Sequence, residues 1–339
     1  GFDARAIVKR TARVAEMVQV NVKYVATKVN RVRFKPESHG LLNRHEYCLV
    51  SGSWDDKPNT LSLWACSAKP SEDSLDAGMR RLYTVELVSD TGDLCFAGAD
   101  ILAAALSSGE VRLYRCSSNE LQEQQRWSHL HPGYPCTAIS ARGPSKLASV
   151  GEDGRLCQLT PGRPEASRII EGANSGCPTC LSYVRQEHVI VGNLAGHLQL
   201  WDLASPDRRP AQDLAWSGQQ VTCLAQHQSQ GHLVACGAAS GQLSLWDLRQ
   251  TRLATVTLAA PTQGALADMV FDPEGSLLFC AHDGSLLCWT TPGAGTPRGE
   301  VEMDALVRPQ GRPLNSLDLQ GPLVAAGSDS ETLLLLSHS

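Results

Sequence analysis

The feature that most constrains the fold of this chain is a repeat of about 45 residues. Each copy begins with an apolar run, continues with a short polar turn, and ends with an alternating strand that closes on an aromatic residue or Leu. In five copies the closing residue lies five positions after a turn glycine, and these glycines are Gly109, Gly154, Gly196, Gly241 and Gly284. Two outer copies, Leu49–Trp64 and Val324–Leu336, lack the glycine but keep the frame. The residues that close the seven copies are Trp64, Tyr114, Leu159, Trp201, Trp246, Trp289 and Leu336.

Each repeat also contains one strand before this hairpin and a weaker strand after it. The first strands are expected at Val29–Phe34, Leu94–Phe96, Thr137–Ser140, Leu181–Val184, Val221–Ala225, Met269–Phe271 and Asn315–Leu319. Examples of the fourth strand are Arg81–Leu87, Arg168–Glu171 and Leu253–Leu258. Four strands per repeat make one propeller blade, and this period is typical of WD repeats. The sequence therefore predicts an all-β fold, a seven-bladed WD-repeat β-propeller.

The ring must also close, because an open blade would leave an unpaired sheet edge. After Leu336 only three residues remain, which is too few for a fourth strand in the last blade. The segment Asn21–Thr27 alternates in polarity and belongs to no repeat, so we predict that it supplies the missing outer strand. We expect residues 17–339 to form the propeller and residues 1–16 to be a non-native or disordered extension.

The residues that close the repeats are interpreted as structural, since a large apolar side chain at this position fills the gap between neighbouring blades. Acidic residues recur at the hairpin tips, where such side chains commonly bond their own turn backbone. These tip residues are Asp55, Asp56, Glu152, Asp153, Asp283 and Asp329. We expect them to stabilise turns and assign none of them to catalysis.

Composition argues against several classes of protein. The formal net charge is −5, and no run of five Lys or Arg occurs, so a nucleic-acid partner is not expected. No apolar stretch reaches the roughly 18 residues that span a bilayer, and no signal peptide is evident, so direct membrane contact is not expected. Most of the 12 Cys lie in apolar runs, which favours reduced core thiols in a cytosolic or nuclear protein.

A search for enzymatic or metal sites identifies no catalytic residue, no cofactor and no metal ligand. The sequence lacks a GxSxG elbow, a P-loop and an HExxH motif. The pair Cys177 and Cys180 has no second ligand pair at a matching spacing. His129 and His131 form an HxH motif in a connector, which we interpret as a solvated loop pair. The chain is therefore predicted not to be an enzyme.

One short motif supports an alternative function. The segment Trp246-Asp247-Leu248-Arg249 reads WDxR, which resembles the motif by which propeller substrate receptors dock on cullin-RING ubiquitin ligases. In this interpretation Asp247 and Arg249 would contact the ligase. The motif is short, and WD endings followed by a loop arginine are common in this fold.

Beyond the fold, several segments resemble the family of forty-three-kilodalton nucleoporins, which belong to the Y-shaped scaffold complex of the nuclear pore. The resemblance begins at Met17 and runs to the end of the chain. It is carried by Lys23–Pro36 (KYVATKVNRVRFKP), Ser51–Trp64 (SGSWDDKPNTLSLW), Val150–Leu156 (VGEDGRL), Leu243–Gln250 (LSLWDLRQ) and Leu314–Leu333 (LNSLDLQGPLVAAGSDSETL). Residues 1–16 have no counterpart in that family, and the connector Thr290–Arg312 is shorter than expected.

The resemblance implies a non-catalytic scaffold subunit of the pore's outer ring, in support of nucleocytoplasmic transport of protein and mRNA. It implies residence in the nucleus, at the nuclear envelope, and association with kinetochores in mitosis. The implied neighbour is the α-helical nucleoporin of about eighty-five kilodaltons in the short arm of the Y. The chain would then be a monomeric propeller within a hetero-oligomer.

Overall fold

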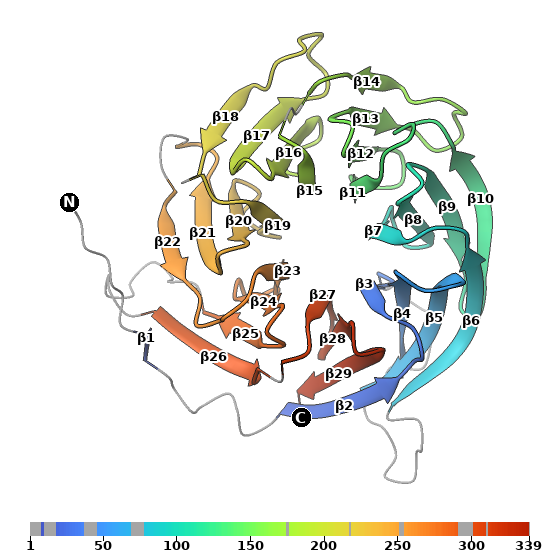
Figure 1. Cartoon of the computed structure of the whole chain (residues 1–339), viewed down its shortest axis with the longest axis vertical. Coiled ribbons are helices and arrows are strands. Elements are labelled where there is room, and N and C mark those ends of the chain that lie inside the picture. Colours follow the sequence, from blue (N-terminus) through green and yellow to red (C-terminus); the bar gives the residue numbers. More distant parts are fainter. Residues whose placement is uncertain are drawn as a thin grey trace.

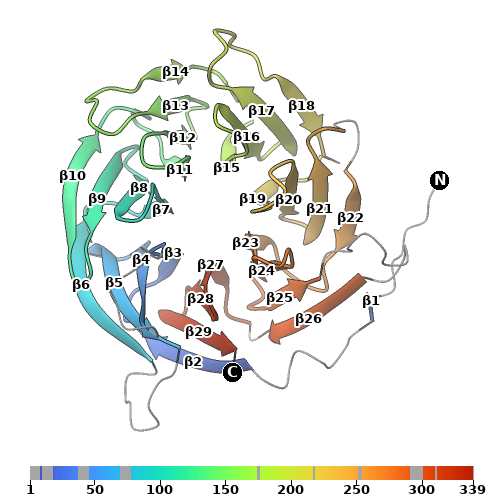
Figure 2. The ribbon, with the colours of Figure 1, turned by 180° about the vertical axis from the view of Figure 1, so that it is seen from behind.

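The computed structural model describes residues 8–9, 18–36, 46–68, 78–173, 176–216, 218–250, 254–290, 301–309 and 311–338. Within these ranges the chain forms 29 strands, which make one five-stranded and six four-stranded sheets. The sheets stand around a central axis as the seven blades of a propeller (Figure 1), and the same ring is seen from behind in Figure 2. The predicted all-β, seven-bladed propeller is confirmed.

The blades follow the chain in order. Blade 1 contains β3 (Val29–Phe34), β4 (Glu46–Ser53), β5 (Asn59–Ser67) and β6 (Met79–Leu87). Blade 2 contains β7 (Thr91–Phe96), β8 (Ile101–Leu106), β9 (Val111–Cys116) and β10 (Leu121–Trp127). Blade 3 contains β11 (Cys136–Ala141), β12 (Leu147–Gly151), β13 (Leu156–Leu159) and β14 (Arg168–Ile170). Blade 4 contains β15 (Pro178–Tyr183), β16 (His188–Asn193), β17 (His197–Asp202) and β18 (Gln212–Ala215).

Three further blades complete the ring. Blade 5 contains β19 (Val221–Gln226), β20 (Leu233–Ala238), β21 (Gln242–Asp247) and β22 (Val256–Ala259). Blade 6 contains β23 (Leu266–Phe271), β24 (Leu277–Ala281), β25 (Leu286–Trp289) and β26 (Val301–Val307). Blade 7 contains β27 (Leu314–Gln320), β28 (Leu323–Ser328), β29 (Thr332–His338) and β2 (Val18–Tyr24). Within each blade, neighbouring strands are antiparallel, and the first of the consecutive strands lies nearest the axis (Figure 1).

Blade 7 is completed from the other end of the chain, as predicted. β2 pairs antiparallel with β29 over seven residue pairs, from Val18 with His338 to Tyr24 with Thr332. The strand lies earlier than the predicted Asn21–Thr27, because the chain turns after Tyr24. The Val25 amide donates to the Glu331 carbonyl at 2.8 Å, and Ala26 has a φ of 61°. Within residues 1–16, Val8–Lys9 forms β1, which pairs in parallel with β26, and the rest of that segment lies outside the described residues.

The hairpin turns have the backbone conformation that their glycines predict. Gly109, Gly154, Gly196, Gly241 and Gly284 all have positive φ, which costs glycine little because it lacks a Cβ. In blade 7 the equivalent turn position is Glu331, with a φ of 58°. The Glu331 side chain accepts a hydrogen bond from the Tyr24 hydroxyl at 2.6 Å. This contact ties the unusual turn to the closing strand β2.

The apolar core is divided between the blades. Buried residues form seven clusters within the described ranges, and each cluster draws on two neighbouring blades. The cluster between blades 7 and 1, for example, joins Leu333 and Leu335 to Val32 and Trp64. Each blade thus buries both of its faces, which explains why its middle strands are apolar on both sides.

Candidate protein-interaction site

The inner strands of the blades share one irregularity. In all seven blades, the register between the first and second strands shifts at the second residue of the first strand. At four of these bulges the side chain donates to a backbone carbonyl of the next blade, and these residues are Asn30, Thr137, Thr179 and Asn315. Asn30 donates to the Thr91 carbonyl at 2.6 Å, and Thr179 donates to the Val221 carbonyl at 2.6 Å. Bulges of this kind re-aim side chains, and here they join the blades around the axis.

A second set of side chains joins the same strands at positions further along each strand, one residue past the bulge for Asp93 and three residues past it for Asp318. The Asp93 carboxylate on β7 accepts from the Ile139 amide on β11 at 3.0 Å. The Asp318 carboxylate on β27 accepts from the Phe34 amide on β3 at 2.7 Å. These two acids in the inner strands therefore accept hydrogen bonds from the backbone of the following blade.

Arg33 is placed at the centre of this arrangement. On β3, its Nη1 lies 2.9 Å from Asp268 Oδ2 on β23 and 3.0 Å from Ser316 Oγ on β27. Its Nε donates to the Leu94 carbonyl on β7 at 3.1 Å, and its Nη2 lies 3.5 Å from Asp93 Oδ1. One guanidinium thereby contacts blades 6, 7 and 2 from its position in blade 1, and it spans the seam at which the ring closes.

The electrostatics of the inner ring follow from these contacts. Burial favours the neutral form of Asp268, but Arg33 and Arg31 outweigh it and hold the pKa of this carboxyl below its usual value. Burial raises the pKa of Asp318 to about 6, although Arg33 opposes the change. The nearby arginine charges therefore outweigh the cost of burying the Asp268 carboxylate, but they only partly offset the cost of burying the Asp318 carboxylate. Sequence reasoning missed these residues, although polar residues recurring inside otherwise apolar first strands were a usable signal.

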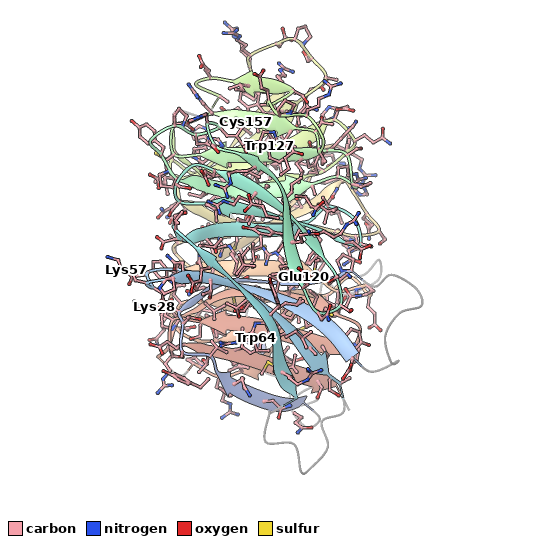
Figure 3. All side chains as sticks on the ribbon, turned by 90° about the vertical axis from the view of Figure 1, so that its right-hand side faces the viewer. Lys28, Lys57, Trp64, Glu120, Trp127 and Cys157 are labelled. Carbon is pink, nitrogen blue, oxygen red and sulfur yellow. The ribbon has the colours of Figure 1, made fainter. Side chains whose placement is uncertain are left out.

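The residues that close the repeats lie on the third consecutive strand of each blade, and all seven are buried. Each pairs with an aliphatic residue on the second strand and packs against the preceding blade, as Trp246 does with Val234 and the blade 4 core. The Trp64 and Trp246 indoles also donate to Ser51 and Ser244, at 2.9 and 2.8 Å. Trp64 is buried between blades 7 and 1. Figure 3, which views the disc from its edge, shows Lys28 and Lys57 projecting at one face.

The structure corrects the interpretation of the HxH motif. His131 is not a solvated loop residue, because its side chain is fully buried. Its Nδ1 lies 2.9 Å from Asp153 Oδ1, and its Nε2 lies 3.1 Å from Ser149 Oγ. Burial lowers the pKa of His131 despite the Asp153 carboxylate. His129 is exposed, so the two histidines do not act together.

Three of the six hairpin-tip acids, Asp153, Asp283 and Asp329, make contacts of two kinds. Asp153 and Asp283 accept hydrogen bonds from the amides two residues further on, Arg155 and Ser285, as expected for turn stabilisation. Asp329 instead accepts from the Trp54 indole at 2.8 Å and therefore links blade 7 to blade 1. These acids thus hold turns or join blades.

The WDxR segment lies at the end of β21 and in the turn that follows. Trp246 is buried, whereas the Arg249 side chain is 61% exposed. The Arg249 guanidinium donates three hydrogen bonds to the Asp247 carboxylate, from Nε to Oδ1 at 3.0 Å and to Oδ2 at 3.2 Å, and from Nη2 to Oδ2 at 2.7 Å. These bonds lower the pKa of Asp247 to about 2. The motif therefore presents an arginine that is already held by its own neighbour.

The cysteines are free thiols, and nine of the 12 are buried. Burial raises the pKa of Cys116 and Cys157 to about 12, so these thiols are inert at neutral pH. No group of three or more potential metal ligands occurs in the part of the chain that the structure describes. In the same part of the chain, no helix is long and apolar enough to cross a membrane.

Comparisons with known proteins place this geometry among WD-repeat proteins. The model of the family described as "WD domain, G-beta repeat" matches residues 211–247. The Homo sapiens protein "Nucleoporin Nup43" is 26% identical over 381 residues, covering 95% of this chain and 99% of that protein. The Mus musculus protein of the same name is 27% identical over 376 residues, covering 94% and 98%. The Homo sapiens "WD repeat-containing protein 55" is 23% identical over 257 residues, covering 71% of this chain and 66% of that protein.

The matches to Nup43 extend over almost the whole of both proteins, whereas the match to the second WD-repeat protein leaves out about a third of it. The coverage fits the repeat frame in the sequence and the seven blades in the structure, because all three indicate a WD-repeat propeller. The chain is therefore a seven-bladed WD-repeat β-propeller that is similar to the nucleoporin Nup43 along nearly its whole length.

Proposed function

We propose that this chain is a non-catalytic, protein-binding scaffold subunit of the nuclear pore outer ring, within the Y-shaped complex. The observation that carries the proposal is the similarity to Nup43 over 95% of this chain and 99% of the human relative. Proteins of unrelated function share the propeller fold, so the fold alone would not carry it.

The architecture suits this role. In the part of the chain that the structure describes, the blades are joined at the axis, and the last blade is closed by pairing of β2 with β29, which holds the ring as one body. Such a body can hold partners in a fixed arrangement without changing shape. Its loops and outer strands offer many separate surfaces.

The partner that we propose is the α-helical scaffold nucleoporin of about eighty-five kilodaltons in the short arm of the Y. The proposed location is the nuclear envelope at the pore, with kinetochore association in mitosis. These statements are supported by the family resemblance of segments such as Ser51–Trp64 and Leu314–Leu333.

The test is affinity purification of the tagged full chain followed by quantitative mass spectrometry, combined with fluorescence imaging of the same fusion. We expect Y-complex nucleoporins to be enriched and the signal to follow the nuclear rim. An unrelated seven-bladed propeller with the same tag is the matched control. Equal recovery of nucleoporins by both proteins, or a diffuse signal for this chain, would rule out the assignment.

The WDxR segment supports a second proposal, a substrate receptor of a cullin-RING ubiquitin ligase. The specific observation is that Arg249 is exposed at a blade end while Trp246 is buried. If this function operates, a ligase adaptor will co-purify with the wild-type chain and be lost with Arg249→Ala. Arg208→Ala, at another exposed loop arginine, is the control and should retain the adaptor. Recovery that does not depend on Arg249 would exclude docking through the motif.

A further inference from the structure

We propose that the outer edge of β2 is a strand-addition site, which binds an extended segment of a partner protein with apolar residues at alternate positions. The inference rests on the proposed function in one respect, because a scaffold subunit needs a docking surface. It adds the location of that surface and the chemistry of its occupant.

β2 carries an exposed apolar row. Val20, Val22 and Tyr24 are 41%, 56% and 66% exposed, and they occupy alternate positions on one face of the strand. Val20 pairs with Leu336 and Val22 with Leu334, so these side chains share a face with their partners. Leu334 and Leu336 belong to the core between blades 6 and 7. The apolar row of β2 therefore continues that core outward into solvent.

The other long outer strands are protected against pairing. β6, β10 and β26 each contain an extra residue that breaks the register with the neighbouring strand, at Leu82, Gln124 and Leu306. β6 and β10 also carry exposed charges, such as Arg80 and Arg126. Bulges and charges are the usual means by which proteins prevent pairing at sheet edges.

The remaining outer strands are protected by their length. β14, β18 and β22 have three or four residues each. β2 has seven, pairs with β29 without a register shift, and contains neither proline nor an acidic residue. Within the described residues, β2 is the outer strand that combines length, regularity and exposed apolar side chains.

The rim of the ring accommodates an added strand at the neighbouring blade. β1 pairs in parallel with β26 through Val8 with Val301 and Lys9 with Glu302, and it forms the fifth strand of that sheet. Figure 1 places β26 and β2 side by side along the perimeter, with β1 outside β26. Strand addition at an outer edge is thus already present in this molecule.

An extended segment fits β2 better than a second copy of the chain does. Two rigid discs that met rim to rim would touch over little more than their two edge strands. Stable dimers bury roughly 1,200–2,000 Å². A flexible segment can pair with the edge and also lay its side chains over Val20 and Val22, as strand-adding peptides do.

The experiment uses the full chain with p-benzoylphenylalanine at position 22 and, as the control, at the exposed position Ile169 on β14. After photocrosslinking in cells, the joined peptide is identified by mass spectrometry and synthesised. Its affinity is measured for the wild type, for the double variant Val20→Lys/Val22→Lys and for Ile169→Lys. We expect crosslinking only from position 22, and binding at least tenfold weaker for the double variant than for Ile169→Lys. N-methylation of alternate backbone amides of the peptide should abolish binding, because it removes the strand pairing.

The substituted side chains are exposed, so the double variant should unfold within a few degrees of the wild type, which a thermal scan verifies. Crosslinks to a second copy or to lipid, no crosslink above the Ile169 control, or equal affinity for the double variant would overturn the proposal. If nucleoporins are still recovered in that case, the proposed function stands and only the β2 site fails. If the joined segment belongs to a protein outside the pore, the site stands and the proposed function fails.

Discussion

Arg33 in blade 1 and Asp268 in blade 6 are joined by an ion pair of 2.9 Å that passes the inner strand of blade 7. The side chains are 22% and 12% exposed, so the pair lies largely out of water. It connects three consecutive blades at the place where the ring must close. The stability of the propeller should therefore depend on it more than on any surface pair.

Replacement of Arg33 by Ala should lower the free energy of unfolding by about 3 kcal/mol, because it leaves Asp268 with its charge largely buried and poorly compensated. Arg126→Ala removes an exposed pair with Glu123 and should cost less than about 1 kcal/mol. Urea denaturation of both variants measures the difference. Equal losses of unfolding free energy in the two variants would mean that Arg33 does not stabilise the closure of the ring between blades 6, 7 and 1.

Trp246→Ala should cost about 3–5 kcal/mol, since it removes a buried ring between blades 4 and 5 and leaves Ser244 without its indole donor. Tyr83→Ala, at a ring that is 38% exposed on β6, serves as the control and should stay within about 0.5 kcal/mol. Denaturant unfolding followed by fluorescence is the measurement. A small effect at Trp246 would contradict its role in filling the gap between the blades.

Removal of residues 1–27 should lower the melting temperature markedly, because β29 would lose the seven pairs it makes with β2 and Val25 would be lost from the core. Removal of residues 1–17 leaves β2 in place and should change the melting temperature little. Differential scanning calorimetry of the two truncations makes the comparison. An unchanged melting temperature for the longer truncation would disprove the closure of blade 7 by β2.

Asp318 should make stability decrease as the pH rises. Burial raises its pKa to about 6, above the value of about 3.9 in an unfolded chain. The folded state therefore binds this proton more tightly, so the contribution is present below about pH 4 and is lost as the pH passes 6. We expect Asp318→Asn to gain stability relative to the wild type between pH 4.5 and pH 7.5 in thermal scans. Asp207→Asn, in an exposed loop, should follow the wild type, and parallel curves for all three proteins would refute the assignment.

The repeat frame predicted the blade count, the turn glycines and the origin of the closing strand, because each depends on local patterns of polarity and backbone freedom. The limits of β2 could not be read from polarity alone. The strand ends at Tyr24 because Val25 bonds to Glu331, a residue more than 300 positions away. His131 was misjudged for a similar reason, since its burial depends on Asp153 and Ser149 in blade 3.

The interaction surfaces were even less accessible to sequence reasoning. Val22 lies in the predicted strand Asn21–Thr27 and Val20 lies just before it, but only the finished ring determines which face of β2 remains in solvent. The network around Arg33 requires four blades to be placed before its partners meet. Contacts between repeats thus carry information that no single repeat contains.

The pairing of β2 with β29 also sets an order of events during synthesis. Tyr24 leaves the ribosome roughly 300 residues before Thr332, its partner, which corresponds to ~15–60 s at ~5–20 residues per second. For that time β2 has no sheet to join, and its exposed Val20 and Val22 are available to chaperones. β2 can pair only after β29 (Thr332–His338) has been synthesised, so a stop codon between β28 and β29 would leave β2 without its partner strand.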